Sequence, residues 1–298
     1  MPPRPDDPTH PPGEPAGGSP LWSRDVLATD DGSPALWSPR YGQAFRSRHG
    51  AHSEARHVFL EGSGAAARLA AGRATRVLEV GLGAATNLAC TAAAALAAGT
   101  PLRYRAWEPE PLPAEALRLA DLGALAPAAF VAALLAARDA WDALAPGDVR
   151  YWRHGTLELE LVVAPIGRML DDAFVASMER GLVAARGADG RATPGADARA
   201  DRRANRAQDV RADVVYLDPF SPEANPEPWA PAVLAALAEC LAPGGTLVSY
   251  SVRGDVRRAL AAAGLEVRKV AGPPGGKREV LLALRPAAPA AAPTRDAP

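Results

Sequence analysis

Short apolar runs rich in Val, Leu and aromatic residues alternate with longer alanine-rich stretches from Arg76 onward. Apolar runs of strand length are typical of strands buried on both faces, and their alternation with helical patterns indicates a parallel sheet covered on both sides. The expected strands span residues 76–80, 102–107, 157–163, 213–217, 246–252, 265–270 and 279–284. The pattern therefore predicts an α/β chain with a seven-stranded, mostly parallel sheet.

Helices are expected between these strands. Gly99 is a plausible C-terminal cap for a helix over residues 86–98, and Pro231 can begin a helix that ends at Pro243-Gly-Gly245. Further helical regions are expected at 113–144, with breaks at Gly123 and Pro127, and at 167–184 and 254–263.

The last two strands are expected to pair antiparallel. Residues 272–278 between them are too few for a crossover helix. A mostly parallel sheet that ends in such a hairpin is the Rossmann-like, class I methyltransferase layout, and it differs from the all-parallel sheet of nicotinamide-binding domains.

Composition divides the rest of the chain. Residues 1–20 are dominated by Pro, Gly and acidic or small residues, and residues 286–298 form an Ala/Pro string, so both are expected to be disordered tails. Residues 186–211 consist almost entirely of Ala, Gly, Asp and Arg and predict a low-complexity insertion. The segment 21–285 is then a single domain, with residues 55–60 packed on it as part of an N-terminal extension.

Charge and cysteine content narrow the possible partners. The formal net charge of −1 provides no overall basic field for nucleic acid, although a local patch remains open. Cys90 and Cys240 lie far apart in apolar helical patterns and are expected to be buried thiols rather than metal ligands. No targeting segment and no run of about 20 apolar residues is found, so a cytoplasmic protein without membrane or metal partners is expected.

A glycine turn follows the first strand, where doubly wound sheets bind ligands: Glu79-Val-Gly81-Leu-Gly83. Such glycines allow a ligand to approach the backbone, although Gly-x-Gly is also common in turns that bind nothing. The third glycine of a dinucleotide fingerprint is missing, and Glu79 would repel a diphosphate but attract a cation. The turn therefore favours S-adenosyl-L-methionine, and Asn87 in the next helix is assigned to the same pocket.

Two further acidic residues follow strands. Glu108 ends the second strand, where a carboxylate can accept both ribose hydroxyls; alone it would be interpreted as a solvated loop residue. Asp218 follows the central strand, and a helix N-cap role is disfavoured because the next helix begins near Pro231. With Pro219 and Phe220 beside it as a wall for a planar base, Asp218 is expected to face the site of methyl transfer.

The segment 217–229, Leu-Asp-Pro-Phe-Ser-Pro-Glu-Ala-Asn-Pro-Glu-Pro-Trp, carries a specific resemblance. It is similar to the Leu-Asp-Gly/Pro-Phe-x-Pro…Asn-Pro-x-x-Trp motif of the tRNA 5-methylaminomethyl-2-thiouridine methyltransferases, which comprise the MnmC-type methyltransferase domain and its free-standing MnmD-like form. Further matches occur in the same order over residues 38–285, among them Arg40-Tyr-Gly, Gly50-Ala-x-x-Glu54-Ala, Ser249-Tyr-Ser251 and Gly276-Lys-Arg-Glu279.

This resemblance implies a substrate and roles for residues. The substrate would be 5-aminomethyl(-2-thio)uridine at the wobble position of tRNA, which becomes 5-methylaminomethyl(-2-thio)uridine. Asp218 would orient the amine and take its proton. Substrate contacts are expected from Pro219, Phe220, Tyr250, Lys277 and Arg278. Because no second dinucleotide fingerprint is present, the chain is expected to be monofunctional, without the oxidase domain of the bifunctional relatives.

The chain departs from the family at two places. Relatives carry Gly-Asp after the third strand to contact adenine, whereas this chain has Ala164-Pro165, so either Asp171 or Asp172 replaces that carboxylate or backbone and packing hold the adenine. The Arg-rich segment 186–211 is either an RNA-contacting flap or a disordered loop, and its aspartates favour the loop.

Two other functions stay open at this stage. One is a methyltransferase of the same fold that acts on a small-molecule or protein amine. Basic residues expected near the rim of the site argue against it, because RNA needs phosphate contacts: Arg253, Arg257, Arg258, Lys277 and Arg278. The other is a degenerate, non-catalytic module that binds an adenosyl group or RNA.

Overall fold

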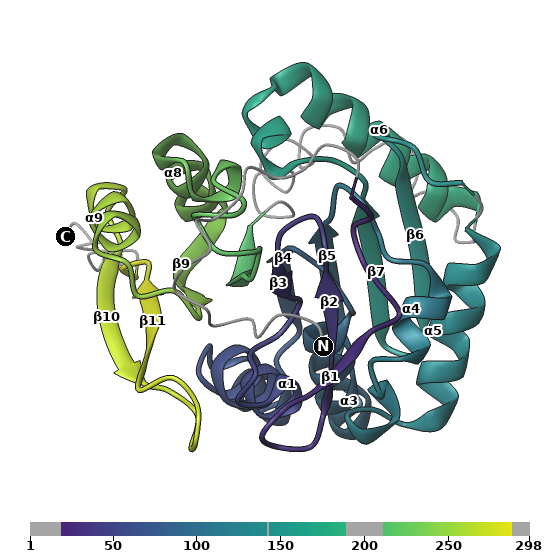
Figure 1. Cartoon of the computed structure of the whole chain (residues 1–298). Coiled ribbons are helices and arrows are strands. Elements are labelled where there is room, and N and C mark those ends of the chain that lie inside the picture. The colour runs from purple at the N-terminus through teal and green to yellow at the C-terminus, as the bar shows by residue number, and fades with distance from the viewer. Residues whose placement is uncertain (1–18, 142, 189–210, 288–298) are drawn as a thin grey trace, which may run out of the picture.

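The computed structural model describes residues 19–141, 143–188 and 211–287, and its centre is a twisted eight-stranded sheet (Figure 1). The strand order is β10-β11-β9-β8-β4-β5-β7-β6. The strands are β4 (Thr75–Val80), β5 (Leu102–Trp107), β6 (Val149–His154), β7 (Leu157–Val162), β8 (Ala212–Leu217), β9 (Leu241–Ser249), β10 (Glu266–Ala271) and β11 (Glu279–Leu284). The parallel centre and the antiparallel β10–β11 hairpin confirm the expected class I layout.

The number of strands expected in the central sheet is corrected from seven to eight among the described residues. The missed strand is β6, which pairs antiparallel with β7 at one edge of the sheet. Its sequence, Val-Arg-Tyr-Trp-Arg-His, is half-buried at every position and has neither an apolar run nor a period of two. β9 begins at Leu241 rather than at residue 246, and the preceding helix α8 ends at Cys240 rather than at Pro243-Gly-Gly245. The Pro243-Gly-Gly245 segment lies within β9, where the pairing of β8 with β9 is irregular.

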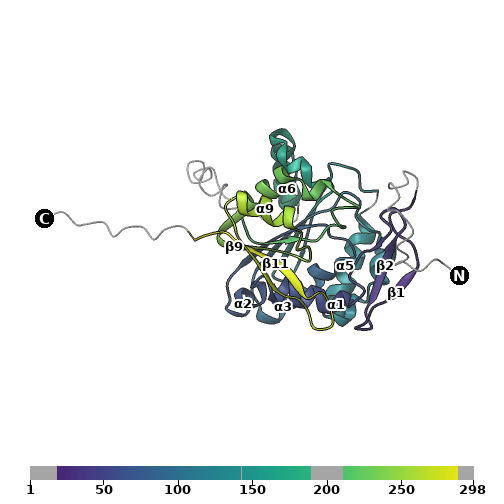
Figure 2. The ribbon, with the colours of Figure 1, turned by 60° about the vertical axis from the view of Figure 1, so that its left-hand side comes forward.

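Helices cover both faces of the sheet, and Figure 2 shows α6 and α9 on one side and α1 to α3 on the other. On the α3 side lie α1 (Ala51–Glu54), η1 (Ala55–Glu61), α2 (Ala65–Ala70), α3 (Thr86–Ala98), α4 (Ala114–Arg118), η2 (Leu122–Ala124) and α5 (Ala128–Ala140). The other elements are η3 (Ile166–Leu170), α6 (Asp172–Ala188), η5 (Glu227–Trp229), α8 (Pro231–Cys240) and α9 (Gly254–Ala262). The breaks expected near Gly123 and Pro127 separate α4, η2 and α5.

The two faces bury separate cores because neighbouring strand residues point to opposite sides. Val214 and Tyr216 of β8 belong to the core on the α3 side, with Phe59 and Tyr104. Val215 and Leu217 belong to the core on the α8 side. This alternation makes β8 and its neighbour β4 rigid supports for the loops at their carboxyl ends.

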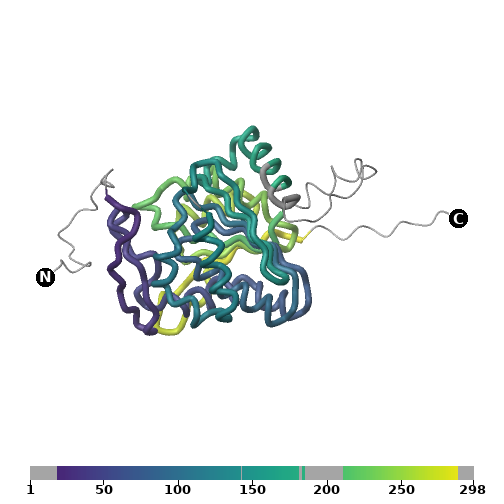
Figure 3. Tube along the Cα trace, turned by 90° about the vertical axis from the view of Figure 1, so that its right-hand side faces the viewer, coloured from purple at the N-terminus to yellow at the C-terminus, as the bar shows by residue number. Residues whose placement is uncertain are grey.

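A second, three-stranded antiparallel sheet is formed by the N-terminal segment, which the tube in Figure 3 shows along one side of the domain. Its strands are β1 (Val26–Ala28), β2 (Pro34–Ser38) and β3 (Gln43–Ala44). The sequence predicted an extension here but no strands, since these are short and weakly apolar. The extension contacts the loop after β8.

Most of the two expected tails and most of the expected insertion lie outside the described residues. Helix α6 continues to Ala188, beyond the predicted start of the insertion at residue 186. Within the described ranges, no helix combines the length and apolar character that crossing a bilayer requires.

Candidate active site

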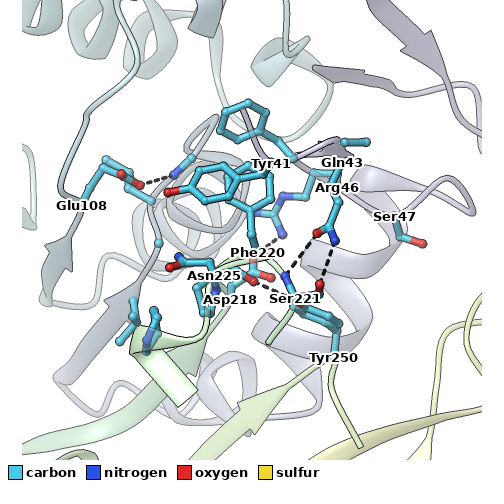
Figure 4. Close-up of a pocket in the computed structure, with 18 of the residues that line it drawn as sticks. Tyr41, Gln43, Arg46, Ser47, Glu108, Asp218, Phe220, Ser221, Asn225 and Tyr250 are labelled. Atoms are coloured by element: carbon cyan, nitrogen blue, oxygen red, sulfur yellow. Dashed lines mark hydrogen bonds and ion pairs between the residues drawn. The ribbon is translucent and has the colours of Figure 1, made fainter. Parts of the chain in front are cut away.

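A cavity of about 840 Å³ opens at the carboxyl ends of β4, β5 and β8, beneath the N-terminal sheet (Figure 4). Three groups of residues line it. The parallel strands and their loops provide Gly81, Gly83, Trp107, Glu108, Pro109, Asp218, Pro219 and Phe220. The N-terminal segment provides Tyr41, Gln43, Phe45, Arg46 and Glu54, and the loops after β7, β8, β9 and β10 provide Pro165, Ile166, Asn225, Glu227, Tyr250 and Lys277. The cavity thus lies at the switch point where doubly wound sheets bind ligands.

The turn after β4 requires glycine at Gly81. Its φ of 86° lies in the left-handed region, and a Cβ there would stand 2.9 Å from the carbonyl oxygen of Asp218. The turn is held by hydrogen bonds from Gly81 N to Trp107 O, at 3.0 Å, and from Asp218 N to Val80 O, at 3.0 Å. Gly81 therefore brings the turn after β4 and the loop after β8 into direct contact.

Glu108 lies at the end of β5 and faces the cavity, as predicted. Its two carboxylate oxygens accept hydrogen bonds from the backbone N–H groups of Gly83 and Glu110, each at 3.1 Å. Burial raises the pKa of Glu108 to about 7, and these backbone donors oppose the rise. A fixed acceptor at this position can bind a vicinal diol.

Glu79 and Asn87 do not line the cavity; they form a buried layer directly behind it. The carboxylate of Glu79 accepts from Asn87 Nδ2 at 2.8 Å and from the Tyr104 hydroxyl at 2.8 Å. Burial raises the pKa of Glu79 to about 8, with Arg46 opposing the rise. Both residues were predicted to contact the cofactor, and their place behind the cavity favours an indirect role in which they support the residues that line it. Asn87 Oδ1 is buried and has no hydrogen-bond partner among the described residues.

Asp218 is held by two donors. Its Oδ2 accepts from Asn87 Nδ2 at 2.8 Å and from Arg46 Nη1 at 2.6 Å. The side chains of Arg46 and Asp218 are only 4% and 8% exposed. Burial raises the pKa of Asp218 to about 7, and the guanidinium of Arg46 opposes that rise. Sequence reasoning missed Arg46, because it precedes Asp218 by 172 residues and belongs to no recognisable motif.

An aromatic wall stands beside Asp218. The ring of Phe220 stacks on Tyr41 with centroids 4.3 Å apart and meets Phe45 edge-on at 5.0 Å. Figure 4 shows Gln43 joined to Ser221 by two bonds, from Gln43 Nε2 to Ser221 Oγ at 2.7 Å and from Ser221 N to Gln43 Oε1 at 3.2 Å. The N-terminal sheet is thereby fixed to the loop that carries Asp218.

Of the four remaining residues that were predicted to contact the substrate, three line the cavity. Pro219 and Tyr250 line the cavity, and the Tyr250 hydroxyl donates to Pro219 O at 2.8 Å. Lys277 also lines it, with Nζ 4.2 Å from the centroid of the Tyr250 ring. Arg278 is exposed and is not among the lining residues, so its contact with the substrate stays a prediction.

The structure favours one of the two alternatives for an adenine contact. Neither Asp171 nor Asp172 lines the cavity, and the Asp171 carboxylate accepts from Phe174 N at 3.1 Å and pairs with Arg168. The cavity wall at this end is formed instead by Trp107, Pro109 and Ile166. At this end of the cavity, a purine could therefore contact backbone groups and apolar side chains but neither of these two carboxylates.

The residues present fit S-adenosyl-L-methionine. Glu108 suits the ribose diol, and the apolar wall suits the adenine. Gly81 and Gly83 of the turn line the cavity, and the carboxylate of Asp218 favours a ligand that carries ammonium and sulfonium charges. The buried, unpartnered Oδ1 of Asn87 is an acceptor in the same region.

Comparisons with known proteins agree with this geometry. Residues 197–286 match a family described as S-adenosyl-L-methionine-dependent methyltransferase. The tRNA 5-methylaminomethyl-2-thiouridine biosynthesis bifunctional protein MnmC of Aromatoleum aromaticum is 33% identical over 269 residues, which cover 85% of this chain and 34% of that protein. The protein of the same name from Burkholderia multivorans is 34% identical over 259 residues, covering 85% and 33%.

This chain thus spans about a third of the length of these curated relatives. Among solved structures, MNMC2 from Aquifex aeolicus superposes with a TM-score of 0.61 at 22% identity, over 90% of this chain and 72% of that one. The superposition extends the likeness to the fold of the whole described domain.

Proposed function

Since the chain belongs to the S-adenosyl-L-methionine-dependent methyltransferases and is related to MnmC over most of its length, we propose that it methylates the primary amine of 5-aminomethyl(-2-thio)uridine at the tRNA wobble position. The observation that carries this proposal is Asp218, a buried carboxylate between the glycine turn and the aromatic wall. The product would be 5-methylaminomethyl(-2-thio)uridine.

The cavity has two ends with different chemistry. Glu108, with the apolar residues near Ile166, would bind the adenosyl group of S-adenosyl-L-methionine, which supplies an electrophilic methyl carbon. Phe220, with Tyr41 and Phe45 around it, would stack against a planar uracil. Lys277 at the cavity wall would meet a phosphate of the same nucleotide.

Asp218 lies where the two ends meet, and its role follows from the chemistry of amines. An ammonium has no lone pair, so it must lose a proton before its nitrogen can attack. The proton passes from the substrate ammonium to the Asp218 carboxylate, and the freed lone pair forms the N–C bond while the C–S bond breaks and leaves its electron pair on sulfur. Alignment of the two substrates in a cavity that excludes water would provide much of the rate enhancement.

The proposal includes the cellular setting. The partner is hypomodified tRNA, the place of action is the cytoplasm, and residues 21–285 act as a single domain with the Ala/Asp/Arg segment as an insertion. Glu79 and Asn87 support the cofactor end from behind.

A methyl-transfer assay tests the function. The purified protein is incubated with methyl-labelled S-adenosyl-L-methionine and tRNA that carries 5-aminomethyl-2-thiouridine, and the tRNA is digested to nucleosides. Label is expected in 5-methylaminomethyl-2-thiouridine alone. Matched tRNA without the aminomethyl group is the control and should remain unlabelled.

Two outcomes would overturn the proposal. Label in another nucleoside, or in a small amine in preference to tRNA, would assign the fold to a different substrate. Absence of transfer together with absence of S-adenosyl-L-methionine binding by calorimetry would identify a non-catalytic module.

A further inference from the structure

The N-terminal segment brings a buried cation to the site that the sequence motifs did not include. Arg46 follows β3 by two residues, and its guanidinium donates to Asp218 Oδ2 at 2.6 Å. It also lies over the Phe59 ring, 5.8 Å from the centroid, which limits its freedom to move. A buried guanidinium is fixed at the carboxylate that the proposed reaction uses.

Two donors converge on the same oxygen of that carboxylate. Asn87 Nδ2 reaches Asp218 Oδ2 from α3 at 2.8 Å. Among the described residues, Oδ1 of Asp218 has no hydrogen-bond partner, and it is not one of the buried unpartnered atoms. Oδ1 is therefore the oxygen that remains accessible from the cavity.

We propose that Arg46 is a positioning residue: together with Asn87 it occupies Oδ2 of Asp218, keeps this carboxylate ionised, and leaves Oδ1 as the oxygen that accepts the proton of the substrate ammonium. This inference rests on the proposed function. It makes the N-terminal segment part of the active site rather than a cover over it. The proton moves from the ammonium nitrogen to Oδ1, and Arg46 loses no proton.

The charges around Asp218 explain why a cation is needed there. Glu79 lies behind it and shares Asn87 as a hydrogen-bond donor, and Glu54 of α1 lines the same cavity. Lys277 approaches from the β10–β11 loop, but it is exposed to solvent at the cavity wall. Arg48 and His49 line the cavity as well. Without Arg46, Asp218 would face Glu54 and Glu79 without the buried ion pair that opposes its protonation. Burial and mutual repulsion would then keep Asp218 protonated near neutral pH.

Three variants separate positioning from packing. Arg46→Met removes the charge but keeps a long apolar chain, and Arg46→Lys keeps the charge but not the planar fork of donors. Gln43→Ala is the matched control, because it removes another link between the N-terminal sheet and the Asp218 loop without changing charge. Each is compared with the unmodified protein in single-turnover methyl transfer across pH and in a ¹³C NMR titration of the carboxyl groups, with Asp218→Asn used to assign the signal.

Arg46→Met is expected to raise the pKa of Asp218 by about one unit or more and to move the acid limb of the rate profile upward by the same amount. Turnover at pH 7 should fall by about fivefold or more and recover as pH rises. Arg46→Lys should lie between Arg46→Met and the unmodified protein. Gln43→Ala should leave the pKa of Asp218 and the position of the acid limb in place, whatever its rate.

An unchanged pKa of Asp218 in Arg46→Met would overturn the inference, as would an equal shift in Gln43→Ala. If Arg46→Met does not fold, Arg46→Gln, which keeps a hydrogen-bond donor but not the charge, decides the same question, because an unshifted pKa of Asp218 in that variant would also overturn the inference. Failure of the unmodified protein to methylate the tRNA would reject the proposed function alone, since the carboxyl titration is read without any substrate.

Discussion

At the scale of single residues, three carboxyl groups around the cavity share one property. The side chains of Glu79 and Asp218 are buried and Glu108 is half-buried, and loss of hydration raises the pKa of each. Removing these ionisable groups from water costs free energy, and this cost destabilises the folded protein when no ligand is bound. A ligand with two positive charges offsets that cost when it binds, which gives the site its preference for such a ligand.

Asp218→Asn keeps the volume and one acceptor atom but removes the proton-accepting charge. The variant is expected to fold and to bind S-adenosyl-L-methionine. Its turnover on tRNA at neutral pH should fall by roughly two orders of magnitude, the usual weight of general base catalysis. The defect should shrink as pH rises, because more of the substrate amine then arrives deprotonated.

Single-turnover rates from pH 6 to 9 and calorimetry with the cofactor provide both measurements. Near-normal turnover at pH 7 would mean that Asp218 is a structural loop residue. Loss of cofactor binding would place it in the adenosyl pocket instead.

Glu79 predicts how stability depends on pH. Its pKa is about 8 in the folded protein and near the ordinary 4.5 when unfolded, so between these values the folded state holds a proton that the unfolded state has lost. The free energy of unfolding should therefore be highest at acidic pH and decline as pH rises from about 5 to 8. One whole proton corresponds to about 1.4 kcal/mol per pH unit.

Urea denaturation of the ligand-free protein at a series of pH values measures this decline. Glu79→Gln, which cannot titrate, should make the decline shallower by about 1.4 kcal/mol per pH unit, and the raised pKa values of Glu108 and Asp218 should maintain the rest of it below about pH 7. A stability that rises with pH in the unmodified protein, or an equally steep decline in Glu79→Gln, would contradict the assignment.

At the scale of elements, the sequence predicted what hydrophobic periodicity can reveal. β4 and β8 are apolar runs buried on both faces, and the glycine turn and the Asp-Pro-Phe segment follow them directly. The sequence did not predict β6 because it is a polar edge strand, and it did not predict β1 to β3 because they are too short for a periodic pattern. Arg46 and Gln43 act through contacts with residues distant in sequence, which no local pattern encodes.

The turn between β2 and β3 should contribute to binding of the substrate base. Tyr41 in this turn stacks on Phe220, so Tyr41→Ala would remove one side of the aromatic wall. The variant should bind tRNA about tenfold or more weakly, given the usual 1–3 kcal/mol for one stacked base, and should bind the cofactor normally. Tyr41→Phe keeps the ring and serves as the matched control.

Filter-binding of hypomodified tRNA and calorimetry with S-adenosyl-L-methionine distinguish these effects. Equal tRNA affinity in Tyr41→Ala and the unmodified protein would exclude stacking by this ring. A parallel loss of cofactor affinity would show that the turn supports the adenosyl end.

At the scale of the whole molecule, the Ala/Asp/Arg segment between α6 and β8 is expected to be dispensable for folding. Replacing residues 191–208 by a short Gly/Ser bridge should leave thermal unfolding and cofactor binding unchanged, because loop-closure entropy varies only slowly with length. Differential scanning calorimetry and tRNA binding at two salt concentrations test this. A loss of tRNA affinity confined to low salt would identify an RNA-contacting flap, and a loss of folding would mean that the segment belongs to the domain.

The pairing of Arg46 with Asp218 also has a consequence for biosynthesis. Arg46 is synthesised 172 residues before Asp218. The central strand β4 is likewise synthesised long before β8, the strand with which it pairs. Until β8 is made, the nascent chain carries an apolar strand with one open edge, a state prone to association. We therefore expect the order of the strands to slow maturation, and a translation product that stops before β8 would lack Asp218 and the site.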